Sequence, residues 1–282
     1  MHTSIKRFGL LLGVLLNISL IGAQTKEIVI LHTNDTHSQI DPNPATASRN
    51  ADEGGVIRRA AAIEDIRKNN PNVLLVDAGD FVQGTPYYNF FKGEVEVKMM
   101  NKMGYQAATL GNHEFDNGME DLARILAMAD FPIVCSNYEV KGTVLEPYVK
   151  KTLVIEQDGV RIGFLGIAVN PEGLISKKNC EGIVFLDPVE TANKYAAELR
   201  REGCDLVVVI SHIGYSKEDT KGDRLVAKES TDIDLIIGGH SHTALNGCVE
   251  VINKNGNPVK ITQTGGRGFT LGRVNLEVEK RK

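Results

Sequence analysis

Five short apolar runs in this sequence are each followed by residues that can bind a metal ion. The runs cover residues 28–33, 73–77, 107–110, 206–211 and 234–237, and we interpret them as β-strands. The residues that follow are, in chain order, Asp35, His37, Asp80, Asn112, His113, Glu114, His212, His240 and His242. The carboxyl ends of the strands in an open α/β sheet share one edge, where ligands bind. The sequence therefore predicts one site at that edge.

The rest of the chain fits a layered α/β fold. Amphipathic stretches between the strands predict helices at residues 56–68, 95–103, 120–129, 188–201 and 224–229. A further strand is expected at 133–136, and the turn pair Asp158-Gly159 predicts a hairpin of 154–156 with 161–168. The segments 249–252, 259–262 and 273–278 indicate a second sheet, and 41–53 and 171–181 are expected to be loops.

The placement of the histidines separates a site from ordinary core residues. Of the six histidines that follow residue 23, five are among these residues at the strand ends. Only His32 lies within a predicted strand instead. A single histidine is usually structural, but a group of five at strand ends indicates metal ligands. Imidazole and carboxylate ligands suit zinc, manganese, iron or cobalt, and the absence of cysteine from the set argues against a closed structural zinc site.

This ligand chemistry predicts two divalent cations and a phosphate substrate. Asp35 and Asp80 supply two negative charges against four positive charges. The surplus attracts phosphate and lowers the pKa of a metal-bound water, which creates a hydroxide for attack on phosphorus. Asp80 is the candidate for the carboxylate that both ions share, at a separation of about 4 Å. Gly79, Gly111 and the pair before His240 are expected to relieve crowding beside the ions.

Composition limits the partners and the compartment. The formal charge of −4 becomes −6 when Lys6 and Arg7 are removed, which argues against a nucleic-acid groove. These two residues, the uncharged run 8–21 and Gly22-Ala23 have the form of a secretory signal, with cleavage expected after Ala23. We therefore expect a signal peptide over 1–23, a single domain over 24–282, and a secreted or periplasmic protein. An uncleaved anchor is the alternative, but the run is short for a span of about 20 residues.

The four cysteines are far apart and form no C-x-x-C pair. Export permits a disulfide, yet buried free thiols are the simpler expectation for Cys135, Cys180, Cys204 and Cys248.

The motifs together resemble a known family. Asp35-x-His37, Gly79-Asp80, the run from Gly111 to Glu114, His212 and Gly239-His240-x-His242 are similar to the signature of calcineurin-like metallophosphoesterases. LHTNDTH at 31–37, QGTPYYNFFKGE at 83–94 and TLGNHEFDNG at 109–118 resemble the 5′-nucleotidase branch. The resemblance implies an α-β-β-α sandwich with the active site at the carboxyl ends of the strands.

The resemblance also implies roles for single residues. His113 would stabilise charge on the transferred phosphoryl group or protonate the leaving oxygen, and Asp116 would orient that imidazole. The alternative for Asp116 is a turn or helix-cap residue, and Glu114 is expected to be structural. One metal site would use Asp35, His37, Asp80 and His242, and the other would use Asp80, Asn112, His212 and His240.

The resemblance favours a phosphomonoesterase acting on nucleotides. The family's C-terminal nucleotide-binding domain does not follow in this sequence, so a separate chain carrying that domain is a possible partner. Two alternatives stay open. One is a phosphodiesterase or nucleotide-sugar pyrophosphatase using the same metals, and the other is a metal-binding subunit without turnover. Tyr87, Tyr88, Phe90 and Phe91 are candidates for an aromatic lip beside the site, with core packing as the alternative.

Overall fold

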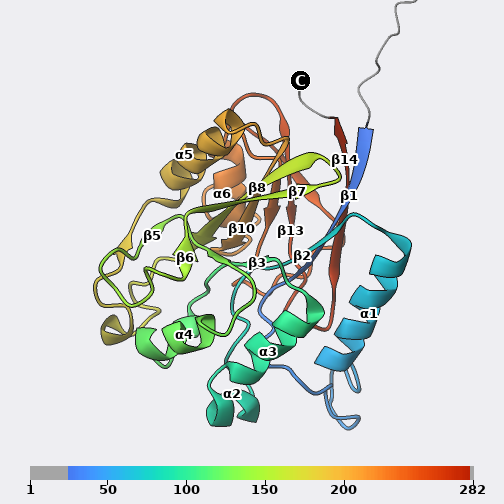
Figure 1. Ribbon diagram of the computed structural model, residues 1–282, viewed down its shortest axis with the longest axis vertical. Coiled ribbons are helices and arrows are strands. Elements are labelled where there is room, and N and C mark those ends of the chain that lie inside the picture. Colours follow the sequence, from blue (N-terminus) through green and yellow to red (C-terminus); the bar gives the residue numbers. More distant parts are fainter. Residues whose placement is uncertain (1–24, 280–282) are drawn as a thin grey trace, which may run out of the picture.

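Two six-stranded sheets pack face to face at the centre of the molecule. We describe residues 25–279 of a computed structural model (Figure 1). The predicted signal peptide over 1–23 lies outside the described residues. None of the helices described between residues 25 and 279 is long and apolar enough to cross a bilayer.

The first sheet is parallel except at one edge. Its order is β14-β1-β2-β3-β4-β6, and β14 pairs antiparallel with β1. Short apolar runs form its central strands because these are covered on both faces, whereas the edge strand β14 alternates buried and exposed residues. The strands are β1 (Thr25–Thr33), β2 (Val73–Asp77), β3 (Ala107–Ala108), β4 (Ile133–Val134), β6 (Val149–Lys150) and β14 (Gly272–Glu279).

The second sheet has a parallel centre and antiparallel edges. Its order is β12-β13-β11-β10-β8-β7. The predicted hairpin is confirmed as β7 paired with β8, and Asp158 and Gly159 both have positive φ, as a tight two-residue turn requires. The strands are β7 (Thr152–Gln157), β8 (Val160–Ala168), β10 (Leu206–His212), β11 (Leu235–Ile237), β12 (Val249–Ile252) and β13 (Pro258–Thr262). A separate short pair joins β5 (Tyr138–Glu139) to β9 (Val184–Phe185).

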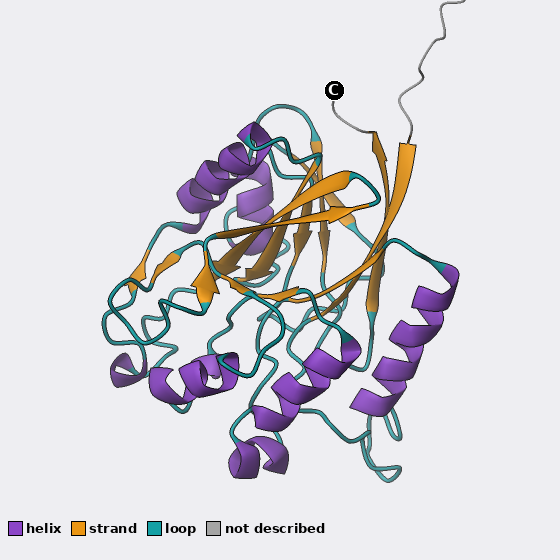
Figure 2. Ribbon diagram, viewed as in Figure 1, coloured by secondary structure: helices purple, strands orange, loops and turns teal. Residues whose placement is uncertain are grey.

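Helices cover the outer face of each sheet (Figures 1 and 2). On the first sheet lie α1 (Val56–Asn69), α3 (Glu94–Met103) and α4 (Met119–Leu126), with the short α2 (Pro86–Phe91) leading into α3. On the second lie α5 (Pro188–Arg201) and α6 (Gly222–Glu229). The α-β-β-α layering expected from the sequence is confirmed.

Alternation along each strand divides the core into three layers. On β1, Ile28 and Ile30 face the second sheet, where they join Phe164 and Val208 in the layer between the sheets. Val29 and Leu31 point the opposite way, toward the helices of the first sheet. Strand side chains alternate between faces, so a single strand contributes to two layers.

Three details of the sequence prediction are wrong or incomplete. Segment 273–278 belongs to β14 of the first sheet, and only β12 and β13 join the second. The strands expected at 107–110 and 133–136 are shorter. After Ala108 the chain runs into the segment that carries Asn112, and after Val134 the backbone N of Ser136 donates to the Gly166 carbonyl of the second sheet. The helix α2 and the short strands β5, β6 and β9 were not predicted. The loops at 41–53 and 171–181 are irregular as expected, apart from a short 3-10 turn at Lys177–Asn179.

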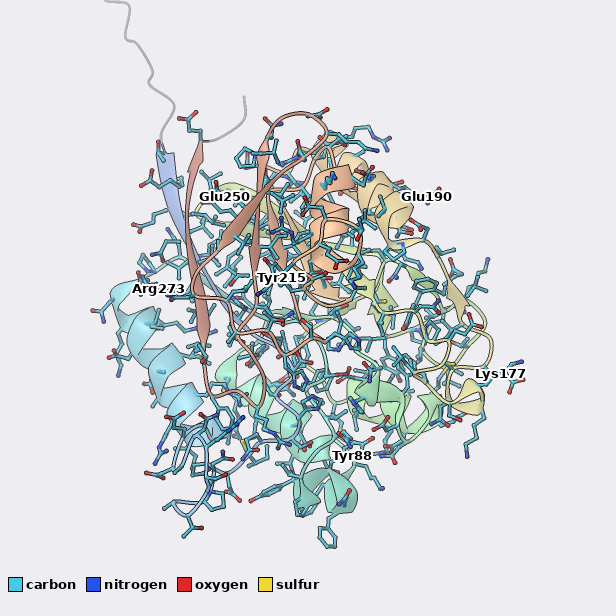
Figure 3. The ribbon with its side chains drawn as sticks, turned by 180° about the vertical axis from the view of Figure 1, so that it is seen from behind. Tyr88, Lys177, Glu190, Tyr215, Glu250 and Arg273 are labelled. Carbon is cyan, nitrogen blue, oxygen red and sulfur yellow. The ribbon has the colours of Figure 1, made fainter. Side chains whose placement is uncertain are left out.

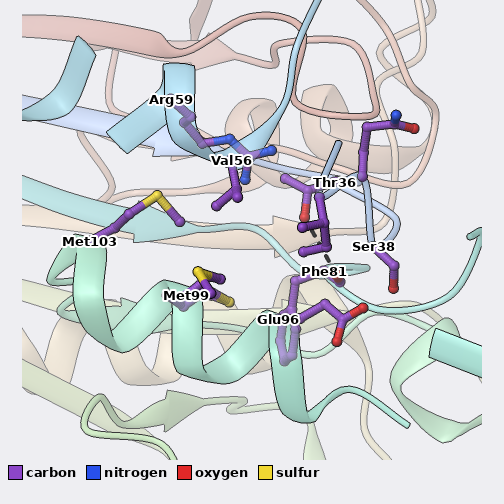
Figure 4. A pocket seen from close by; sticks show the side chains of 11 residues that line it. Thr36, Ser38, Val56, Arg59, Phe81, Glu96, Met99 and Met103 are labelled. Atoms are coloured by element: carbon purple, nitrogen blue, oxygen red, sulfur yellow. Dashed lines mark hydrogen bonds between the residues drawn. The ribbon is translucent and has the colours of Figure 1, made fainter. Parts of the chain in front are cut away.

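A small cavity lies beneath the turn at 36–40, between α1 and α3 (Figure 4). Glu96 of α3 is 4% exposed, and neither of its carboxylate oxygens has a hydrogen-bond partner of normal geometry among the described residues. Burial raises the pKa of Glu96, and the nearby Ser38 hydroxyl opposes this only in part. A buried carboxylate of this kind destabilises the folded protein once it is ionised.

Replacing Glu96 by glutamine should therefore stabilise the protein in a pH-dependent way. A carboxyl whose pKa is raised by folding destabilises the folded state as the pH rises above the pKa of the unfolded chain. We expect E96Q to gain about 1 kcal/mol at pH 8, or roughly 2–4 °C in Tm, and almost nothing at pH 4. Thermal melts at both pH values test this, with the exposed Glu64→Gln on α1 as control. An equal shift at both pH values would contradict the explanation.

Candidate metal centre

All seven predicted ligand residues lie at one edge of the two sheets. Each follows or ends a strand: β1 leads to Asp35 and His37, β2 to Asp80, and β3 to Asn112. β10 ends at His212, and β11 leads to His240 and His242. The central strands of each sheet are parallel, so their carboxyl ends meet at this edge.

The first cluster consists of Asp35, His37 and His242. Their ligand atoms all lie within 4.8 Å of one another. The Nε2 atoms of His37 and His242 are 3.0 Å apart, and His242 Nε2 is 3.2 Å from Asp35 Oδ1. Two imidazole nitrogens at this distance need a proton or a cation between them, because their lone pairs otherwise repel.

The second cluster consists of Asp80, His212 and His240, also within 4.8 Å of one another. His212 Nε2 lies 3.0 Å from Asp80 Oδ2, and Asn112 Oδ1 lies 3.1 Å from His240 Nδ1. The other ring nitrogen of His212 is 2.6 Å from the Ala78 carbonyl. A backbone carbonyl at Nδ1 fixes the tautomer and leaves Nε2 free to bind a metal, as in known metal sites.

The charged form of the Asp80 carboxylate is strongly stabilised by the neighbouring His212. Burial by itself lowers the pKa of His212, but Asp80 outweighs it and raises that pKa to about 10. Burial opposes ionisation of Asp80, yet His212 holds the pKa of Asp80 far below its usual value. The pair thus shares positive and negative charge in a buried position, which is the arrangement that a divalent cation would replace.

The backbone is strained where the ligands lie. Five of the seven residues have left-handed φ values between 47° and 72°, namely Asp35, His37, Asp80, His240 and His242. Residues other than glycine rarely adopt this backbone conformation, and clusters of residues that do so are typical of functional sites. Backbone hydrogen bonds hold the turns in place, including Asp35 N to the Gly79 carbonyl at 2.9 Å and His37 N to the Asp80 carbonyl at 3.0 Å.

Gly111 shows how closely the segments approach. A Cβ atom at this position would lie 2.1 Å from Asp80 Oδ1 and 2.7 Å from His212 Nε2. The requirement for glycine here agrees with the crowding expected from the sequence.

Gly111→Ala should displace the Asp80 carboxylate. We expect a loss of metal binding and a destabilisation of about 1–3 kcal/mol from overpacking, checked by metal analysis and thermal melts. Gly142→Ala is the control, since an added Cβ there meets nothing within 4 Å and the positive φ costs only about 1 kcal/mol. Normal metal content in Gly111→Ala would contradict this interpretation of the site.

His113 and Asp116 lie beside the first cluster. The His113 ring is 5.3 Å from that of His37 between centroids, and its Nδ1 is 2.9 Å from Asp116 Oδ2. The hydrogen bond to Asp116 raises the pKa of His113. His113 is half-buried and its backbone N donates to Asp80 Oδ1 at 2.9 Å, so the pair faces the site.

Three supporting residues complete the site. Glu114 is buried and accepts hydrogen bonds from the backbone N atoms of Asp80, Phe81 and Gly111, which makes it a structural residue, as expected. Sequence reasoning did not find Asn34 or Asn179. Asn34 donates to Asp35 Oδ2 at 2.6 Å, and Asn179 donates to the carbonyls of Phe115 and Asp116 at 2.9 and 3.1 Å. The position of Asn34 directly before the predicted ligand Asp35 could have indicated its role. No neighbouring residue in the sequence indicates a role for Asn179.

The aromatic residues proposed as a lip separate into two kinds. Tyr88 is buried in the core, while Phe90 and Phe91 on α2 are 79% and 49% exposed. A substrate role for the exposed pair stays a prediction. The expectation of buried free thiols is met by Cys135 and Cys204. Cys180 is only half-buried and Cys248 is exposed, and no disulfide forms among the four.

The donor set fits two divalent cations. Imidazole nitrogens and carboxylate oxygens converge in two adjacent groups, and no thiolate takes part. Asp35 Oδ1 is 3.2 Å from His242 Nε2 and 3.8 Å from His212 Nε2, so it lies between the clusters.

Comparison with known proteins identifies the family to which this fold and site belong. The layers and the paired ligand clusters define a layered α/β protein with a candidate centre for two metal ions. The chain matches the calcineurin-like phosphoesterase family over residues 28–244, and it belongs to that family. The family resemblance seen in the sequence is thus confirmed.

Several 5′-nucleotidases are similar to the chain. It is 34% identical over 232 residues to a snake venom 5′-nucleotidase of Gloydius brevicauda, covering 80% of this chain and 38% of that one. Among solved structures, the 5′-nucleotidase precursor of Thermus thermophilus has a TM-score of 0.82 and 32% identity over 90% of this chain and 53% of its own. The NAD nucleotidase of Haemophilus influenzae has the same TM-score and coverage at 28% identity. The chain therefore spans about two fifths to one half of these relatives.

Proposed function

We propose that this protein is a dinuclear metal-dependent phosphoester hydrolase that releases phosphate from nucleoside monophosphates. The observation that supports this most directly is that the two ligand clusters lie next to each other, with Asp35 between them. His113, hydrogen-bonded to Asp116, lies beside them. The 5′-nucleotidases among its relatives support the nucleotide substrate.

In this proposal the seven ligand residues keep the grouping given by the resemblance. By the resemblance Asp80 would hold both ions, although Asp35 Oδ1 also lies between the two clusters. Asp35, His37 and His242 would complete one site, and Asn112, His212 and His240 would complete the other. The bound cations would supply charge neutralisation for a phosphoryl group and activation of a water nucleophile. His113 donates a hydrogen bond or a proton to the leaving oxygen, and Asp116 orients its ring and favours its charged form.

Selectivity for the nucleoside is the part of the proposal that depends on relatives alone. They extend well beyond the matched segment, and we propose that a nucleotide-binding domain outside the described residues completes the substrate pocket. Selective turnover of one nucleoside monophosphate by the isolated chain, with an ordinary KM, would end this part of the proposal. We also propose export of the protein, on the pattern of residues 1–23.

A substrate panel combined with metal analysis tests the function. The purified chain is loaded with manganese, cobalt or zinc and assayed with AMP, p-nitrophenyl phosphate, bis-p-nitrophenyl phosphate, a nucleotide sugar and NAD. We expect two metal ions per chain and the fastest phosphate release from monoesters. Faster cleavage of the diester, the sugar nucleotide or NAD would favour the phosphodiesterase or pyrophosphatase alternative, which the likeness to an NAD nucleotidase makes worth testing. No turnover despite full metal occupancy would favour a non-catalytic metal-binding subunit.

A further inference from the structure

Arg267 lies on the loop between β13 and β14, directly against the ligand-bearing turn after β1. Its backbone N donates to the Asp35 carbonyl at 2.6 Å. Its φ of 58° is left-handed, which is costly for arginine and persists only where surrounding contacts impose it. This strain fixes the point at which the side chain leaves the backbone, next to the first ligand cluster.

The same loop touches a second ligand of that cluster. A Cβ atom at Gly266 would lie 3.2 Å from His242 Nδ1 and 3.6 Å from the Asp35 carbonyl. The loop backbone therefore packs closely on both Asp35 and His242. Arg267 is the charged residue at this contact.

The guanidinium of Arg267 has no carboxylate partner among the described residues. Its Nη1 donates at 3.3 Å to the neutral amide of Gln39, two residues after His37, and the residue is exposed. Arg58 and Arg124, by contrast, are each paired with an aspartate. The Arg267 guanidinium, which is always positively charged, thus lies beside the turn that carries Asp35 and His37 and has no anionic partner among the described residues.

We propose that Arg267 binds the phosphate dianion of a phosphomonoester held at the two ligand clusters. Guanidinium groups match phosphate oxygens in a bidentate geometry, and the arginine would exchange its weak bond to Gln39 for charge-assisted bonds. This inference rests on the proposed function and adds a substrate-binding residue to it. The arrangement favours doubly charged monoesters over singly charged diesters.

A structural role for Arg267 is the competing explanation, since the residue also connects the loop to Asp35 and Gln39. Arg267→Gln separates the two roles because it removes the charge but keeps a side chain that can hydrogen-bond to Gln39. Arg273→Gln is the matched control. Arg273 is an exposed arginine on β14 (Figure 3) that bonds only to the neutral side chains of Asn275 and Asn70 among the described residues.

Calorimetric titration of the metal-loaded chain with inorganic phosphate tests the proposal directly. We expect Arg267→Gln to weaken phosphate binding by roughly 10- to 100-fold at unchanged metal content, with Arg273→Gln like the unmodified protein. Its KM for p-nitrophenyl phosphate should rise more than its KM for the bis ester, with a smaller change in kcat.

The outcomes keep the two proposals apart. Unchanged phosphate binding in Arg267→Gln, or a loss of metal from it, would overturn the role of Arg267 and leave the hydrolase function standing. If the unmodified chain hydrolyses no phosphoester but binds phosphate through Arg267, the hydrolase proposal fails and the anion site stands.

Discussion

Asp80→Asn should lower the metal content of the protein below two ions per chain and reduce phosphoester turnover by roughly 10³-fold or more. The amide keeps the shape of the side chain but removes one of the two negative charges that the clusters contain. Asp80 Oδ2 lies 3.0 Å from His212 Nε2, and Asp80 Oδ1 accepts from His113 N, so the change affects both the ligand set and the turn that carries His113. Metal analysis and initial rates with p-nitrophenyl phosphate measure the effect.

Asp65→Asn is the control for the change of aspartate to asparagine, because Asp65 is exposed on α1. It should leave both quantities unchanged. Asp80→Asn protein that is folded and binds two ions with full turnover would exclude Asp80 as the shared ligand. A variant that fails to fold is recognised by its circular dichroism and melting curve.

His113→Ala should reduce turnover by about 10² to 10⁴-fold while both metal ions stay bound. The residue is not among the ligand groups, and its ring is held by Asp116 at 2.9 Å beside His37. If His113 protonates the leaving oxygen, the loss should be larger for AMP than for p-nitrophenyl phosphate, whose leaving group needs no proton. Equal losses for both substrates would assign His113 to charge stabilisation.

Asp116→Asn provides the graded comparison, since it removes the orienting charge and keeps the imidazole. Its loss of turnover should be smaller than that of His113→Ala. His113→Ala protein with normal turnover, or with reduced metal content, would contradict the assignment of His113 as a residue that acts on the substrate.

The local pattern of the chain was sufficient to predict the layers and the edge that holds the site. Strands such as β1 and β10 are short apolar runs, and each is recognised from its own residues. The position of β14 was not predictable in this way. Its alternating pattern fits an edge strand of either sheet, and only pairing with β1 decides between them.

The supporting residues depended on contacts between distant segments. Asn179 reaches the carbonyl of Asp116 from a loop more than sixty residues away, and Arg267 meets Asp35 across more than two hundred. A pattern of residues close together in the sequence cannot predict contacts between segments this far apart. Their proximity follows from how the loops cross the edge of the sheets.

By itself the sequence determined which residues end the strands, in what order, and with which ligand chemistry, because strand periodicity and residue type are local properties. Only the tertiary structure decided the left-handed turns at Asp35 and Asp80, the close approach at Gly111 and the unpaired charge of Arg267. The physical reason is that these features arise where separate loops pack against one another, and the packing, not the preference of any single residue, sets the backbone angles and the distances.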